Sequence, residues 1–136
     1  MDTDAVVAAM RSPSGASAAI LRAVRQDKAT LLLTVPLAVE YEAVCSKNEH
    51  RLAAGLSERQ VDIFLDAVIA MAVPVETHFL WRPQLRDPND EMVLEAAVNG
   101  RADVLVTFNQ RDFGSIPDRF GVEALLPREV IRRIKR

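Results

Sequence analysis

Short apolar runs that alternate with segments of helical periodicity are the feature that most constrains how this chain folds. Residues 29–35 form one such run, bounded by a lysine and a proline, which indicates a strand buried on both faces of a parallel sheet. Residues 103–107 form a second run, residues 122–126 a short last one, and residues 73–76 a weak candidate. This alternation predicts an α/β fold with a mostly parallel sheet and helices on both of its faces.

Turn and capping signals delimit the predicted helices. Ser57 and Gln60 form a capping-box pattern at the start of one helix, and Asn99 with Gly100 stops the next. No helix is predicted in the polar segment 46–51. The predicted helices cover residues 5–10, 16–26, 37–45, 58–71, 88–99 and 127–135.

One domain accounts for the whole sequence. The 136 residues suffice to bury a core and no linker or repeat divides them, so we predict a single domain over residues 1–136. The single cysteine, Cys45, has no partner for a disulfide or a zinc ribbon. The start lacks a signal-peptide pattern, and no apolar run reaches the roughly 20 residues of a membrane span. We therefore expect a cytoplasmic protein without a membrane association.

The weakly acidic charge balance bears on nucleic-acid binding. A net charge of -2 and a pI near 5.7 argue against a broad basic surface that binds phosphate. If RNA is the substrate, its phosphate must be neutralised locally, by bound metal ions or by arginines near the acidic positions. Arg86 and Arg111 are the candidates for substrate contacts, and a solvated surface is the alternative.

Several acidic residues fall where a parallel sheet gathers its ligands, at the carboxyl ends of the strands. Asp112 follows the predicted strand 103–107 after a short loop. Asp2 precedes the first predicted helix and would end a first strand, of which only Met1 is present. We therefore predict that Asp2 and Asp112 lie at the same edge of the sheet.

Asp90 lies at the head of the inward face of its predicted helix, because Val93, Leu94 and Ala97 follow it at helical spacing. A carboxylate there is costly unless a charge or a hydrogen bond meets it. The alternative is an N-cap, although Asp87 and Asn89 could cap equally well.

Glu40 and Glu42 are rival candidates on the helix after the second strand. Apolar residues flank both at helical spacing, so periodicity does not choose between them.

Carboxylates brought together in this way would repel one another unless a cation compensates, and Mg²⁺ or Mn²⁺ takes hard oxygen ligands. Such a site can activate water for attack on a phosphodiester without a Ser, Cys or His nucleophile. In agreement, His50 and His78 are isolated, and no nucleophile elbow, P-loop or dinucleotide fingerprint occurs.

Four blocks of this sequence resemble the PIN-domain family, in particular the toxin components of bacterial toxin–antitoxin modules. The blocks are residues 2–7, 36–41, 86–97 and 107–113. By this resemblance the catalytic and metal-binding residues are Asp2, Glu40, Asp90 and Asp112, which selects Glu40 over Glu42. The blocks also contain the residues expected to support the site, Asp4, Asp87, Thr107 and Asn109.

The resemblance implies a three-layer domain with about five parallel strands between helices. It also implies Mg²⁺- or Mn²⁺-dependent endoribonuclease activity, a homodimer, and inhibition by a small antitoxin. Family members usually carry several residues of first strand before the initial aspartate, so a truncated first strand is predicted here. Activity then depends on how Asp2 is positioned.

Two other hypotheses remain open from the sequence. One is a PIN-like module that binds RNA or a protein without cutting, which the short first strand and acidic pI favour. The other is a phosphotransfer enzyme with Asp2 and Asp4 as an aspartyl pair, but no lysine is well placed for it. Trp81 is a candidate for stacking on a base, with packing as its alternative.

Overall fold

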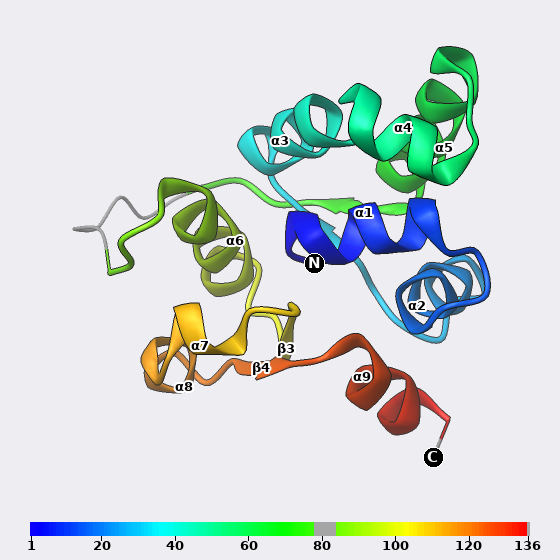
Figure 1. Cartoon of the computed structure of the whole chain (residues 1–136). Coiled ribbons are helices and arrows are strands. Elements are labelled where there is room, and N and C mark those ends of the chain that lie inside the picture. The colour runs from blue at the N-terminus through cyan, green and yellow to red at the C-terminus, as the bar shows by residue number, and fades with distance from the viewer. Residues whose placement is uncertain (78–83, 136) are drawn as a thin grey trace.

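Helices surround two pairs of short strands in the computed structural model, which describes residues 1–77 and 84–135 (Figure 1). His78 and Trp81 lie outside the described residues. The helices are α1 (Thr3–Arg11), α2 (Ala16–Arg25), α3 (Val35–Cys45), α4 (Asn48–Ala54), α5 (Glu58–Met71), α6 (Pro88–Asn99), α7 (Gln110–Phe113), α8 (Ile116–Arg119) and α9 (Pro127–Ile134). The strands are β1 (Leu32–Leu33), β2 (Val73–Pro74), β3 (Val104–Val106) and β4 (Glu123–Leu125).

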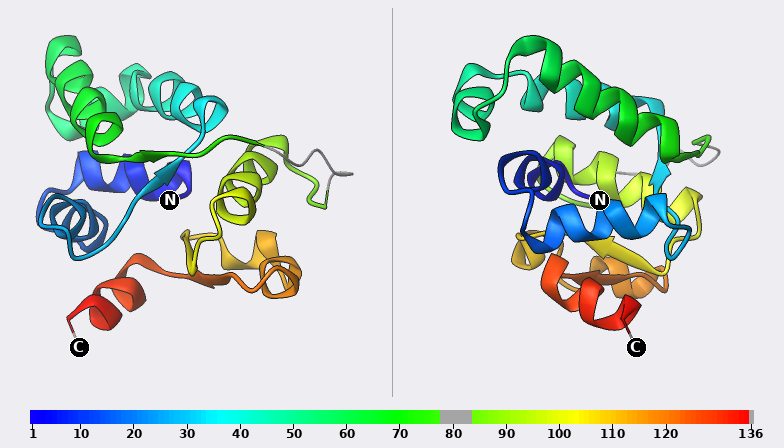
Figure 2. Two further views of the ribbon diagram at one scale, coloured as in Figure 1. Left: turned by 180° about the vertical axis from the view of Figure 1, so that it is seen from behind. Right: turned by 90° about the vertical axis from the view of Figure 1, so that its right-hand side faces the viewer.

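The strands are parallel, as predicted, but they do not form one sheet of about five strands. Within the described residues β1 pairs only with β2, and β3 pairs only with β4. The β1–β2 pair lies above the β3–β4 pair in Figures 1 and 2. The α/β class is therefore confirmed, whereas the structure contains two small sheets in place of the continuous one.

A largely apolar cavity of about 780 Å³ explains why the two pairs stay separate. It is lined by Leu31 and Leu32 at β1 and by Leu105 and Val106 of β3, with Met1 also in its wall. The amide of Asp2 donates to the carbonyl of Val106 at 2.8 Å, so the start of the chain lies against the end of β3. Met1 alone does not bridge the edges of β1 and β3.

The six predicted helices are confirmed to within a few residues, and three further helices were not predicted. The predicted capping box is formed, because the Ser57 hydroxyl accepts from the Gln60 amide at 3.1 Å and the Gln60 side chain accepts from the Ser57 amide at 2.8 Å. Helix α4 buries none of its side chains, and α7 and α8 are single turns of four residues each. Such elements carry no apolar periodicity for a sequence pattern to detect.

Helix α1 lies at the centre of the core and packs against α2 and α3. Val6 is fully buried there, as are Leu37 and Tyr41 of α3. The Tyr41 hydroxyl donates a hydrogen bond to the carbonyl of Met1, which joins α3 to the start of the chain. No helix in the described part of the chain is long and apolar enough to cross a membrane.

We expect the Tyr41→Phe substitution to destabilise the protein by about 1 kcal/mol, because it removes the hydroxyl that satisfies the Met1 carbonyl. Urea unfolding measures the change. Glu42→Gln on the exposed face of the same helix is the control, with an expected effect within about 0.5 kcal/mol. Equal stability of Tyr41→Phe and the wild type would contradict the assigned role of this hydrogen bond.

Candidate metal-binding site

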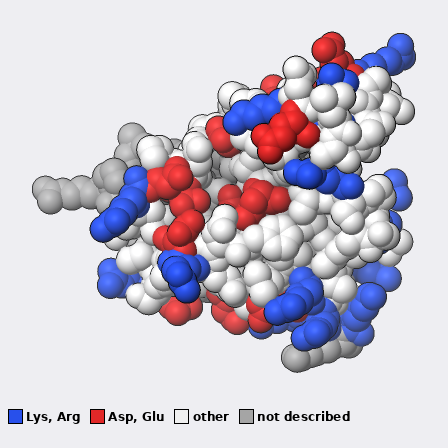
Figure 3. Space-filling view, viewed as in Figure 1, with Lys and Arg blue, Asp and Glu red and all other residues white. Residues whose placement is uncertain are grey.

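Acidic side chains from three helix starts gather on one face of the molecule (Figure 3). Asp2 directly precedes α1 and Asp4 lies in its first turn. Asp87 and Asp90 lie at the start of α6, and Asp112 lies in α7. The carboxylates interact electrostatically, since Asp2, Asp87 and Asp112 all contribute to the raised pKa of Asp90. The fold therefore brings together three of the four predicted acidic residues.

Asp2 is buried, with 7% of its surface exposed, and is held by Thr107. The Thr107 hydroxyl donates to Oδ2 of Asp2 at 2.7 Å and accepts from the amide of Asn109 at 2.9 Å. Burial raises the pKa of Asp2, and the hydrogen bond from Thr107 partly opposes that shift. Thr107 thus sets the position of Asp2.

Asp4 is the second carboxylate fixed to the end of β3. Its Oδ2 accepts from the backbone amide of Phe108 at 3.2 Å and from the side-chain amide of Asn109 at 3.0 Å. Its Oδ1 is buried and has no hydrogen-bond partner in the described residues. Burial, followed by the charge of Asp2, raises the pKa of Asp4 to about 6. The carboxylate thus has one oxygen held by hydrogen bonds and one buried without a partner in the described residues.

Asp90 does not cap α6, so that alternative is wrong. Asp87 is the N-cap, and its Oδ1 accepts from the amide of Asn89 at 2.8 Å. Burial, and then the charges of Asp2, Asp87 and Asp112, raise the pKa of Asp90 to about 6. Capping by Asp87 leaves the Asp90 carboxylate available to the cluster.

Glu91 is a buried carboxylate beside the site whose structural role the sequence reasoning missed. It is 8% exposed, and its carboxylate accepts from the backbone amides of Gln84 at 3.1 Å and Leu85 at 2.9 Å. These bonds tie the segment before α6 to the helix. Leu94, three residues later, was the available signal, because it places Glu91 on an inward-facing row.

Glu40 is half-buried on α3, the helix that packs against α6. Its rival Glu42 is exposed. The predicted arginines, Arg86 and Arg111, are exposed and line a surface cavity of about 600 Å³ together with Asp87, Asp90 and Asp112.

The donor set suits a hard divalent cation but is not arranged as a finished ligand shell. Among the described residues, no group of three or more His, Cys, Asp or Glu side chains lies close enough together to hold a metal ion. The chemistry nevertheless fits Mg²⁺ or Mn²⁺, which take carboxylate oxygens. The buried, unpartnered Oδ1 of Asp4 and the mutual repulsion around Asp90 are both features that a cation would compensate.

Comparison with known proteins identifies one family. The PIN domain family matches residues 1–111, which include every candidate residue except Asp112. No curated protein and no solved structure matches the chain.

We expect the metal-free protein to lose stability as the pH rises from about 4 to about 6. The pKa values of Asp4 and Asp90, both raised to about 6, mean that the native state binds more protons than the unfolded state in the window between about 4 and 6. Melting temperatures in EDTA measure this. Asp90→Asn should melt above the wild type at the upper pH, whereas Asp62→Asn on the exposed face of α5 should not.

The buried hydroxyl of Thr107 should be required for stability. Thr107→Ala removes a donor to Asp2 and an acceptor for Asn109, at an expected cost of about 1–3 kcal/mol by chemical denaturation. Thr107→Ser retains the hydroxyl and should recover most of the loss. If the alanine and serine variants were equally destabilised, the lost methyl group, and not the hydrogen bonds, would account for the effect.

Proposed function

This chain belongs to the PIN-domain family, and we propose that it is a metal-dependent endoribonuclease that hydrolyses RNA phosphodiesters. PIN domains are commonly nucleases. The observation that carries the proposal is the convergence of Asp2, Asp4 and Asp90 at the end of β3, with Asp2 fixed by Thr107. A carboxylate in a folded protein normally lies beside a cation or is exposed to water, whereas these three carboxylates lie near one another.

The proposed roles follow from where each side chain lies. Asp2, Asp90 and Asp112 would hold Mg²⁺ or Mn²⁺, with the free oxygen of Asp4 beside them and Glu40 as the remaining proposed ligand. A bound divalent ion would supply activation of water and neutralisation of the phosphate charge. Thr107 and Asn109 orient Asp2 and Asp4.

We propose that two exposed arginines contact the substrate. Arg86 and Arg111 line the surface cavity that also contains Asp90 and Asp112. Their guanidinium groups would bind RNA phosphates at the edge of the acidic cluster, where the chain has no broad basic surface. The net charge of -2 makes such local cations the means of attracting RNA.

A PIN-like module that binds RNA or a protein without cutting it is the second candidate. The lack of a finished ligand shell among the described residues favours it. The two functions differ in one observable, because only the nuclease converts RNA to shorter products.

We also propose that the protein is the toxin of a toxin–antitoxin module, acts as a homodimer and is inhibited by a small antitoxin. Exposed apolar side chains on α3 and α5 support a protein partner: Val35 and Val39 are 77% and 58% exposed, and Ile63 is 58% exposed. Size-exclusion chromatography with light scattering tests the dimer. A short reading frame encoding an antitoxin beside the gene would support the toxin role.

Purified protein is expected to cleave single-stranded RNA with Mg²⁺ or Mn²⁺ and to stop when EDTA is added. Asp90→Asn and Asp112→Asn should each lower the cleavage rate by at least about 100-fold, since even supporting residues around metal sites contribute roughly 10–100-fold. Asp62→Asn is the matched control and should cleave at the wild-type rate.

Cleavage that survives EDTA or the Asp90→Asn substitution would rule out the carboxylate–metal mechanism. Binding of RNA without any cleavage would favour the second candidate. Glu40→Gln measures the contribution of the remaining proposed ligand.

A further inference from the structure

A pocket of about 380 Å³ lies beside the acidic site, where α1, α2 and α9 approach the end of β3. Most of its exposed lining is apolar and comes from small residues or from Leu126 and Pro127 at the start of α9. Phe108, Ser17 and Arg128 complete the wall. None of these three side chains has a role in the metal site described above.

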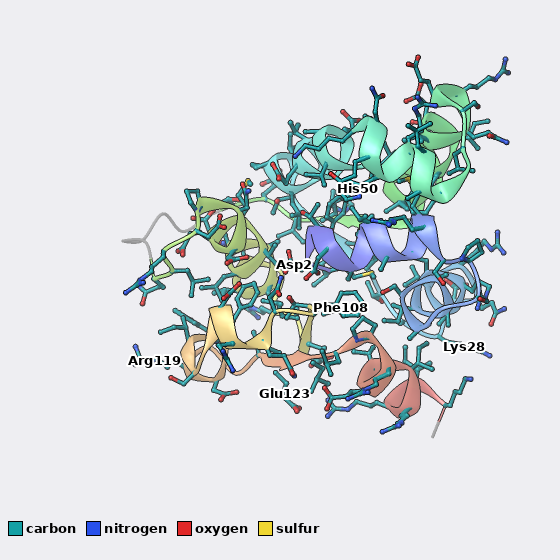
Figure 4. All side chains as sticks on the ribbon, viewed as in Figure 1. Asp2, Lys28, His50, Phe108, Arg119 and Glu123 are labelled. Carbon is teal, nitrogen blue, oxygen red and sulfur yellow. The ribbon has the colours of Figure 1, made fainter. Side chains whose placement is uncertain are left out.

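Phe108 presents an aromatic ring next to the candidate site. The side chain is 49% exposed, although the residue directly follows Thr107 and donates its amide to Oδ2 of Asp4. Figure 4 shows Phe108 beside Asp2, on the side toward α9. An exposed aromatic face of this kind provides a stacking surface for a nucleobase. Its backbone hydrogen bond fixes the distance between this surface and the carboxylates.

Ser17 supplies an unsatisfied polar group in the same pocket. The residue is only 3% exposed, yet its hydroxyl has no hydrogen-bond partner in the described part of the chain. Buried hydroxyls are normally hydrogen-bonded, so an exception in a pocket wall points to a ligand. Helix α2 also begins here, with Gly15 as an N-cap that provides no side-chain acceptor. The first-turn amides of α2 therefore favour an anionic oxygen.

Arg128 adds a cation to the wall of the pocket. It is exposed in the first turn of α9. In Figure 3 an uncharged area separates the acidic side chains from the basic side chains over α9. The order along this face is a carboxylate cluster, an aromatic and apolar pocket, and a cation. Successive groups along an RNA strand follow the same order: a phosphate that would lie at a metal, then the adjoining sugar and base, then the next phosphate.

We propose that this pocket binds the nucleotide next to the scissile phosphate, with its base on Phe108, its sugar and phosphate near Ser17 and the start of α2, and the following phosphate facing Arg128. The inference rests on the proposed endoribonuclease function. It concerns binding, however, which is measurable without cleavage.

The experiment uses single-stranded RNA that carries 2-aminopurine, whose fluorescence falls when it stacks, titrated with the full-length protein in EDTA. The wild type should quench the probe. Phe108→Ala should abolish the quenching and weaken binding by about tenfold. Phe108→Tyr retains an aromatic face and should restore both. Phe120→Ala, at an exposed phenylalanine away from the pocket, is the matched control and should behave as the wild type.

Arg128→Gln separates the phosphate contact from stacking. It should leave the quenching in place and lower the slope of log affinity against log salt by about one. Thermal melting of each variant verifies that it is folded, which is expected because Phe108 and Arg128 are exposed.

The outcomes distinguish the two proposals. Wild-type cleavage with unchanged binding in Phe108→Ala would overturn the nucleotide pocket and leave the nuclease function standing. Binding that depends on Phe108 without cleavage in Mn²⁺ would do the opposite. Failure of the wild type to bind or quench the RNA in EDTA would also overturn the pocket.

Discussion

The buried hydrogen bond between Thr107 and Asp2 is the interaction on which the rest of the site depends. It joins residues separated by 105 positions, and the backbone bond from Asp2 to Val106 runs beside it. Together these bonds place the start of α1 against the end of β3. Asp4 lies in the first turn of α1 and accepts hydrogen bonds from Phe108 and Asn109 at the same strand end. One contact therefore sets both carboxylates and the aromatic ring.

In the absence of a cation the carboxylate cluster lowers the stability of the fold, and the loss grows as the carboxylates ionise with rising pH. Burial and mutual repulsion raise the pKa values of Asp4 and Asp90 to about 6. Near neutral pH both carboxylates are therefore ionised at a cost in folding free energy. A fold retains such an arrangement where a ligand offsets it. The core around α1 offsets it in the free protein, through fully buried side chains such as Val6, Leu37 and Tyr41.

The sequence predicted an element correctly where its apolar pattern was long enough to detect. Helices with apolar periodicity, such as α2 and α5, were found, whereas α4 was missed because it buries no side chain. Parallel pairing was predicted, but the extent of the sheet was not, since it depends on contacts between distant edges. Asp90 was identified from the inward helix face, and Asp112 from its strand end.

Other site residues were beyond the sequence signal. Glu91 was missed because its partners are backbone amides, which have no sequence signature. Phe108 was read as part of a loop, and only the folded chain shows its exposed ring beside Ser17. Glu40 was selected over Glu42 by resemblance alone, because both lie on α3 with apolar residues at helical spacing.

The separation of the two strand pairs gives α1 a structural role that a continuous sheet would otherwise have. No strand among the described residues links β1 to β3, so the position of Asp2 relative to α6 cannot be transmitted through a hydrogen-bonded ladder. It is transmitted through packing, because α1 contacts α3 and α3 contacts α6. Tyr41 strengthens the first of these contacts through its bond to Met1. The distance between Asp2 and Asp90 therefore depends on helix packing and not on a hydrogen-bonded ladder.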